Sequence, residues 1–180
     1  MLEDRVFTMI DRFSLLQFME SGHDMSSKFI ALGALGALLL TGQTFAAGIE
    51  DAITFTGDFT LLVNGKPLDP TVQGKNPLIV SETYQLGSNQ FALIAEQGGE
   101  ACPTQLWLVE SDGKTAKATP KFGTCTDAYD AKKTGDSITI TMSGFLGPSN
   151  PKAAQAKAAK ERHVFVYKAG ILTENGKPVK

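Results

Sequence analysis

Apolar and polar residues alternate with a period of two through much of the chain after residue 50, and this pattern limits the fold most. Successive side chains of a strand point to opposite faces, so such alternation predicts half-buried strands. It recurs, with many β-branched and aromatic residues, at 53–56, 59–63, 78–80, 83–86, 90–96, 105–110, 137–142 and 163–167. We predict seven or eight short strands in a mainly β fold, a small antiparallel barrel or sandwich.

Turn-forming pairs separate several of these runs. Asn64-Gly65 directly follows an apolar run, Asp112-Gly113 follows the run 106–109 after two polar residues, and Glu174 is followed by a second Asn-Gly pair. Both residues of such a pair accept the positive φ that tight hairpin turns require. We expect hairpins at each, the last of them at an edge of the fold.

One segment favours a helix. Residues 151–162 are rich in Ala and Lys, which are strong helix formers, with Asn150 placed to cap the helix and Pro151 to occupy its first position. The pattern predicts a short helix of about three turns before the last strands. Its alanine face could pack closely on a sheet.

The region before residue 47 has the layout of a signal peptide. Residues 29–40 form an uncharged apolar run that follows Lys28, and small residues at Thr44 and Ala46 suit a peptidase site. Such a run is shorter than the roughly 20 residues that cross a bilayer. We expect cleavage after Ala46, or alternatively Ala47, and no stable membrane span after processing.

Three regions follow from this. Residues 25–46 would be the signal peptide, and 47–180 a single β-rich domain. Residues 1–24 carry five acidic side chains, unlike the positive start of a signal peptide. We interpret them as a tail or an upstream misreading of the start codon. An amphipathic helix is the alternative, because apolar residues recur near helical spacing at Val6, Met9, Ile10, Phe13 and Leu16.

The only two cysteines, Cys102 and Cys125, both lie in the exported part. An even cysteine count in an exported protein predicts a disulfide rather than reactive thiols. Closing a loop of this length stabilises a fold by about 3 kcal/mol in the chain-entropy account. The expected location is therefore periplasmic or secreted.

The charge of the exported part argues against nucleic-acid partners. Removing the charged residues before Met25, and Lys28, leaves 14 basic and 14 acidic side chains, with Arg162 as the only arginine. Nucleic-acid binding depends on a basic surface.

The sequence contains few residues in patterns typical of an enzyme active site. His163 is the only histidine after residue 47, and it opens a strand where we expect a solvent-facing polar residue. A hydrolase could instead use paired carboxylates. The acids around the central strands are Glu96, Glu100, Glu110 and Asp112.

We expect neither a cofactor nor a zinc site, because the cysteines are paired and the histidine is alone. Weak calcium candidates are Asp127, Asp130 and Asp136, which supply oxygen ligands without the spacing of an EF-hand.

Aromatic and apolar residues near turns form a candidate ligand-binding patch. Its members are Trp107, Phe122, Tyr129, Phe145 and Leu146. Core packing is the alternative role, since Trp107 and Val109 share one face of a strand while Leu106 and Leu108 share the other. Both faces of that strand could then be covered.

The sequence favours a non-catalytic binding or envelope accessory protein whose ligand is a small molecule, a glycan or a protein. Two alternatives remain, a small periplasmic hydrolase and a structural or inhibitor-type module that binds proteins. A ligand-binding protein needs an apolar pocket, and a hydrolase needs two carboxylates that face each other in a cleft. A module that binds proteins by strand addition needs a long uncovered strand edge.

Overall fold

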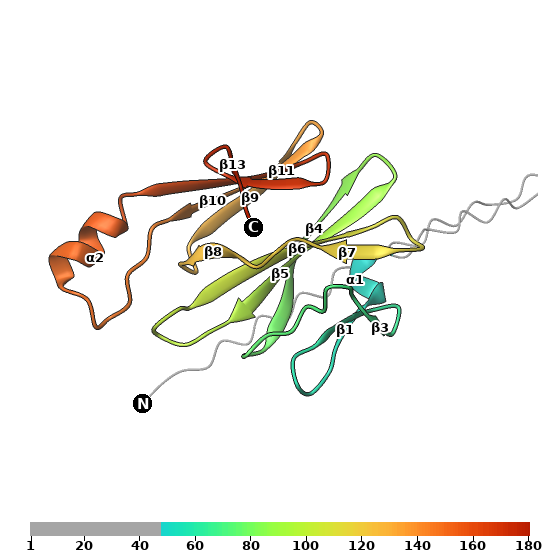
Figure 1. Cartoon of the computed structure of the whole chain (residues 1–180), viewed down its shortest axis with the longest axis horizontal. Coiled ribbons are helices and arrows are strands. Elements are labelled where there is room, and N and C mark those ends of the chain that lie inside the picture. Colours follow the sequence, from blue (N-terminus) through green and yellow to red (C-terminus); the bar gives the residue numbers. More distant parts are fainter. Residues whose placement is uncertain (1–47) are drawn as a thin grey trace, which may run out of the picture. The chain divides into compact units, whose positions relative to one another are not determined.

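The computed structural model describes residues 48–180, which belong to one compact unit. The expected signal peptide, its cleavage at Ala46 and the tail 1–24 lie outside the described residues. Three antiparallel sheets make up most of the domain, and two short helices accompany them (Figure 1).

The central sheet is buried on both faces. Its strands are β4 (Leu78–Leu86), β5 (Asn89–Gln97), β6 (Thr104–Ser111), β7 (Ala116–Ala118) and β8 (Phe122–Cys125). They run in the order β4-β5-β6, and β7 and β8 pair with successive parts of β6. Every residue of β5 from Phe91 to Glu96 is buried. Such a run fits a sheet covered on both sides.

A second sheet packs on one face of the central sheet. Its order is β13-β12-β11-β10-β9, with bounds β9 (Tyr129–Thr134), β10 (Ser137–Ser143), β11 (Arg162–Lys168), β12 (Ile171–Glu174) and β13 (Lys177–Pro178). The core between the two sheets comes from alternate residues of each, among them Leu93, Leu108, Ile140 and Phe165. Phe122 and Phe165 lie with ring centroids 5.0 Å apart in this core.

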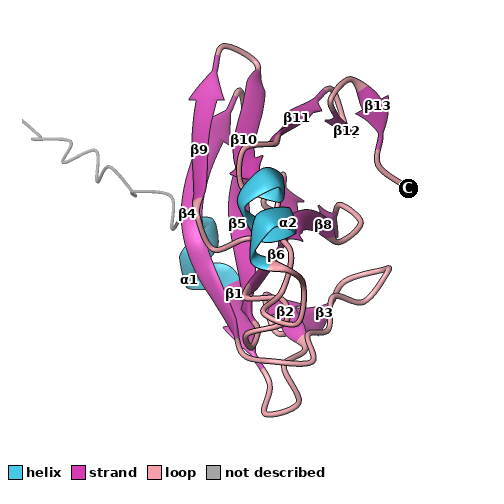
Figure 2. Ribbon diagram, turned by 90° about the vertical axis from the view of Figure 1, so that its left-hand side faces the viewer, coloured by secondary structure: helices cyan, strands magenta, loops and turns pink. Residues whose placement is uncertain are grey.

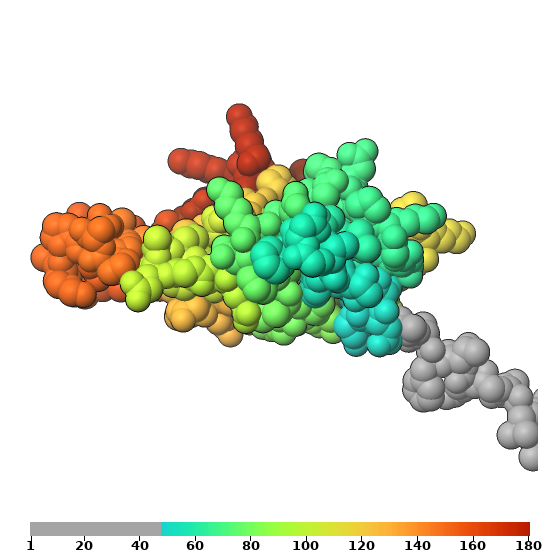
Figure 3. All heavy atoms as spheres, turned by 90° about the horizontal axis from the view of Figure 1, so that it is seen from below, coloured from blue at the N-terminus to red at the C-terminus, as the bar shows by residue number. Residues whose placement is uncertain are grey.

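A small N-terminal layer covers the other face (Figures 1 and 3). It consists of α1 (Ile49–Ala52), β1 (Ile53–Phe55), β2 (Leu61–Val63) and β3 (Lys66–Pro67). Its apolar side chains pack with Ile94, Trp107 and Val109 of the central sheet. The prediction that Trp107 and Val109 share one covered face, and Leu106 and Leu108 the other, is confirmed.

The domain is mainly β, as predicted, but none of its sheets closes on itself. The barrel is therefore wrong for residues 48–180, and sheets stack face to face as in a sandwich. The structure has thirteen strand segments in these residues, more than the seven or eight predicted. The additional ones, apart from the six-residue β9, are two to four residues long, too short for periodicity to show.

The predicted hairpins are present. Asn64 and Gly65 have φ of 52° and 73° between β2 and β3, and Asn175 and Gly176 have 48° and 79° between β12 and β13. Asp112 accepts backbone hydrogen bonds from Lys114 and Thr115 in the turn from β6 to β7. The last hairpin lies at an edge, as expected, because β13 ends its sheet.

The predicted helix exists but is shorter, since α2 spans Lys152–Ala158. Pro151 is its N-cap, and Asn150 lies one residue outside. The Asn150 side-chain amide donates to the Gly147 carbonyl, and the Asn150 backbone carbonyl accepts a hydrogen bond from the Gln155 side chain. Asn150 thus fixes the preceding loop to the helix. Figure 1 shows α2 at one end of the domain, and Figure 2 views the domain from that end, with α2 in front.

A β-bulge reverses the faces of β4. Pairing with β5 shifts between Val80 and Glu82. Leu78 and Val80 pack in the N-terminal layer, whereas Tyr84 and Leu86 pack in the core of the sandwich. One inserted residue therefore lets a single strand serve both cores.

The predicted disulfide joins Cys102 and Cys125, whose Cα atoms are 4.6 Å apart. It ties the loop that leads into β6 to the end of β8, which pairs with β6. Within residues 48–180, neither helix is long and apolar enough to cross a membrane.

Candidate functional site

A groove of about 530 Å³ opens beside α2, at one end of the sandwich core. We call it the α2 groove. Its walls are α2, the loop after β10 and the end of β8, and β11 and β12 contribute charged side chains. The lining residues are Gly123, Thr124, Gly144, Phe145, Leu146, Ala154, Lys157, Ala158, Glu161, His163 and Glu174.

Strand geometry brings His163 and Glu174 into the groove. Phe165 and Tyr167 of β11 are buried in the sandwich core, and His163 lies on the same face two residues earlier. Glu174 pairs with Phe165, which places it on that face too. The expectation that His163 faces solvent is wrong, because its ring is only 25% exposed.

His163 lies between two carboxylates. Its Nδ1 is 2.7 Å from Glu174 Oε1, a hydrogen bond, while Nε2 is 3.9 Å from Glu161 Oε2. A neutral imidazole has one N–H donor, so the bond to Glu174 fixes which nitrogen carries the proton. Glu174 therefore orients the ring, and Glu161 keeps its hydrogen-bonding capacity.

Gly144 holds the groove wall against the end of α2. A Cβ at this position would lie 2.5 Å from the Ala158 carbonyl oxygen, closer than real contacts allow. The Gly144 N–H donates to the Glu161 carbonyl, and the Thr124 hydroxyl donates to the Ser143 carbonyl. Only glycine fits this approach of two backbones.

The remaining wall is apolar and carries one cation. Phe145 is half-buried, Leu146 is 39% exposed, and Ala154 and Ala158 face them from α2. The Lys157 ammonium has no hydrogen bond or ion pair with any other described residue. The groove thus combines an apolar surface with separate positive and negative groups.

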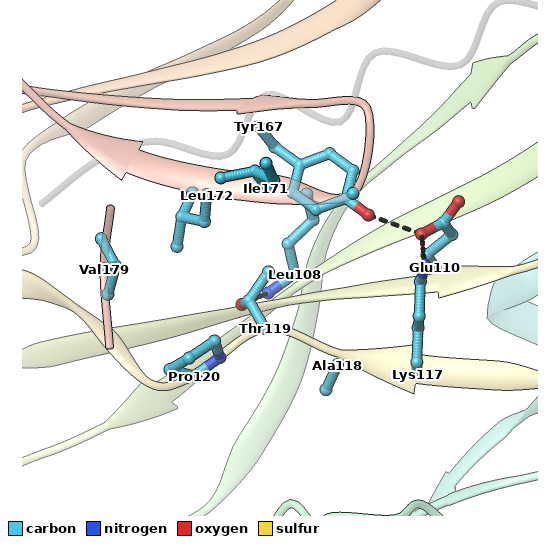
Figure 4. Close-up of a pocket in the computed structure, with 11 residues that line it drawn as sticks. Leu108, Glu110, Lys117, Ala118, Thr119, Pro120, Tyr167, Ile171, Leu172 and Val179 are labelled. Atoms are coloured by element: carbon cyan, nitrogen blue, oxygen red, sulfur yellow. Dashed lines mark hydrogen bonds and ion pairs between the residues drawn. The ribbon is translucent and has the colours of Figure 1, made fainter. Parts of the chain in front are cut away.

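A second hollow, of about 210 Å³, lies between the two sheets farther along β11 (Figure 4). Aliphatic side chains including Leu108, Leu172 and Val179 form its walls. At one end the Glu110 carboxylate accepts from the Tyr167 hydroxyl at 2.5 Å, lies 3.0 Å from the Lys117 ammonium, and accepts from Asn89 at 2.6 Å.

Burial and these contacts together shift the pKa values of Glu110 and Tyr167 in opposite directions. Burial raises the pKa of Glu110, but the hydrogen bonds from Tyr167, Lys117 and Asn89 outweigh it and hold that pKa below its usual value. Burial, and next the hydrogen bond to Glu110, raises the pKa of Tyr167. The polar groups of this hollow already satisfy one another, and it is smaller than the roughly 300 Å³ of a typical ligand pocket. The α2 groove is therefore the better candidate site.

The five residues of the predicted patch do not form one surface. Trp107 and Phe122 are buried on opposite faces of the central sheet, and Lys121 lies 4.6 Å above the Trp107 ring. Tyr129 is partly buried, and its hydroxyl hydrogen-bonds Ser81. These three residues have packing roles. Phe145 and Leu146 alone line the α2 groove.

The carboxylates suggested for a hydrolase are separated. Glu96 lies on the face of the central sheet toward the N-terminal layer, whereas Glu110 lies on the face toward the second sheet. Asp112 accepts hydrogen bonds within its turn, and Glu100 is exposed in the loop before β6. The buried Glu96 and the partly buried Glu110 thus cannot face each other across a cleft.

The calcium candidates are also apart. Asp130 lies in β9 near Lys132, and Asp136 lies beyond the other end of that strand, 3.1 Å from Lys168. Asp127 is exposed in the loop before β9. In the described part of the chain, no three His, Cys, Asp or Glu side chains gather closely enough to hold a metal ion.

Strand addition would need a long uncovered edge. β4 is a nine-residue edge strand of the central sheet. Its bulge interrupts the regular ladder, however, and bulges protect edges from pairing with other chains.

The sequence signal for the groove was partial. The Gly-bounded Phe145-Leu146 loop pointed to it, and the alternation His163, Phe165, Tyr167 could have placed His163 on the inner face. The groove draws on residues from 123 to 174, which only the folded sheets bring together. Comparison with protein-family models, curated proteins and solved structures gave no match to this chain.

Proposed function

We propose that the chain is an exported, non-catalytic binding protein that holds a small ligand in the α2 groove. One observation carries this proposal: an apolar wall at Phe145 and Leu146 faces polar groups of His163, Glu174 and Lys157 in one groove of about 530 Å³. Ligand pockets of about 300–1,000 Å³ typically pair apolar walls with a few oriented polar groups.

Two further features support this proposal, one for export and one for a groove that is already formed before the ligand binds. The Cys102–Cys125 disulfide suits an oxidising compartment outside the cytoplasm. The His163–Glu174 hydrogen bond and the Gly144 contact with α2 hold two walls of the groove in place. A groove fixed before binding loses less entropy when the ligand arrives.

We test this with the substitution Leu146→Asp, which places a charge on the apolar wall. The exported protein is screened by thermal unfolding against separate sets of amino acids, dipeptides, sugars, carboxylic acids and amines. A ligand at 100 times its Kd stabilises the native state by about 2.7 kcal/mol, which raises Tm by several degrees. We expect such a rise in the wild type and its loss in Leu146→Asp.

Ile171→Asp is the matched control, because Ile171 is also exposed, at 58%, and lies outside the groove. This variant should keep the response to the ligand. Equal protection of Leu146→Asp and the wild type would place binding elsewhere and contradict the proposal.

A further inference from the structure

We propose that the ligand of the α2 groove is a zwitterion with an apolar side chain, such as an apolar amino acid or short peptide. This inference rests on the proposed function and adds the chemical class of the ligand. It comes from the charged groups of the groove that other described residues leave unsatisfied.

The positive group is the Lys157 ammonium on the α2 wall. It forms no ion pair or hydrogen bond within residues 48–180, and it lines the groove, whereas the other lysine of α2, Lys152, does not. An ammonium at the rim of an apolar groove suits a carboxylate of the ligand.

The negative groups lie on the strand side. Glu174 uses Oε1 for His163, which leaves Oε2 available, and the Glu161 carboxylate has only the His163 ring at 3.9 Å. Carboxylates accept hydrogen bonds only, so they suit an ammonium of the ligand. His163 keeps them apart and holds Glu174 in position.

A ligand with a single charge would cover one of these groups and leave the opposite one without a partner. A zwitterion pairs with groups of both signs and so gains one ion pair more than a ligand with a single charge. The apolar side chain would pack on Phe145 and Leu146. The groove volume of about 530 Å³ accommodates a dipeptide.

The test uses isothermal titration of the exported protein with leucyl-leucine, its C-terminal amide and its N-acetyl form. Each blocked form lacks one charge. We expect leucyl-leucine to bind and each blocked form to bind about fivefold more weakly, the size of one exposed ion pair. Free leucine distinguishes an amino-acid ligand from a peptide ligand.

Substitutions then assign the charges. Lys157→Gln should weaken leucyl-leucine about fivefold and leave the amide unchanged. Glu161→Gln should weaken leucyl-leucine and leave the N-acetyl form unchanged. Lys160→Gln is the matched control, since Lys160 is exposed just beyond α2 and outside the groove lining.

Two results would overturn the inference: equal binding of free and blocked dipeptides, or equal effects of Lys157→Gln and Lys160→Gln. Protection by a sugar, amine or carboxylic acid that Leu146→Asp abolishes, with no heat from leucine or leucyl-leucine, would overturn the zwitterion and leave the proposed function intact. Ligand protection that persists in Leu146→Asp would instead contradict the proposed function.

Discussion

Glu96→Ala is expected to lower the free energy of unfolding by about 3 kcal/mol, because it removes the centre of a buried polar network. The Glu96 carboxylate is 4% exposed and accepts from the backbone N–H groups of Lys75 and Asn76. Its other oxygen lies 2.6 Å from the Lys121 ammonium, which also covers Trp107. Alanine would remove the buried carboxylate on which these part-buried donors converge and leave them without this acceptor. Urea unfolding at pH 7 measures the loss.

The same network predicts a pH dependence. Burial raises the pKa of Glu96, but Lys121, the Lys75 backbone and Asn76 outweigh it and place that pKa below its ordinary value of 4.5. A carboxyl with a lowered folded pKa stabilises the native state above its unfolded pKa, and this contribution disappears as pH falls through the folded pKa. Wild-type stability should therefore fall more steeply below about pH 4.5 than that of Glu96→Gln.

Glu100→Gln serves as the control, because Glu100 is exposed. It should match the wild type within about 0.5 kcal/mol. A Glu96→Ala protein as stable as Glu100→Gln would show that the network does not stabilise the domain.

Removing the disulfide is the second large effect. The double substitution Cys102→Ser and Cys125→Ser should cost about 3 kcal/mol, because the bridge closes a loop between residues 23 positions apart. The loss should be measurable by urea unfolding under non-reducing conditions.

Reduced and alkylated wild-type protein is the comparison for the serine variant. Both should unfold at similar, lower urea concentrations than the oxidised protein. An oxidised protein no more stable than the serine variant would contradict a stabilising role for the disulfide.

Local sequence signals predicted the local elements well. Both Asn-Gly pairs adopt the expected positive φ because their backbone preference is set by the residues themselves, whereas at Asp112-Gly113 only the glycine does. Alternation placed Trp107 and Leu108 on opposite covered faces. The disulfide followed from cysteine count alone.

What the sequence did not predict depends on tertiary contacts. Helix α1 has four residues, too few for a 3.6-residue period to be recognised. The bulge in β4 appears only in its pairing with β5. Trp107 and Phe122 were candidates for a ligand-binding patch, but each is buried in a separate core, because aromatic residues near turns have the same sequence pattern whether they line a pocket or a core.

The candidate site was likewise predicted only where the signal is local. The Phe145-Leu146 loop was identified from its flanking glycines, whereas the hydrogen bond between His163 and Glu174 depends on the pairing of β11 with β12. The isolated charge of Lys157 also needs the structure, because a lysine-rich helix gives no sign of which lysine faces a groove.

The central claim is that the α2 groove holds the ligand, and amide chemical-shift mapping tests it most directly. The protein, labelled with ¹⁵N, is titrated with whichever compound stabilises it most in the thermal screen. We predict that the largest shifts fall on Gly144 to Leu146, on α2 and on His163. Shifts confined to the hollow at Glu110 and Tyr167, with the groove amides unchanged, would contradict it.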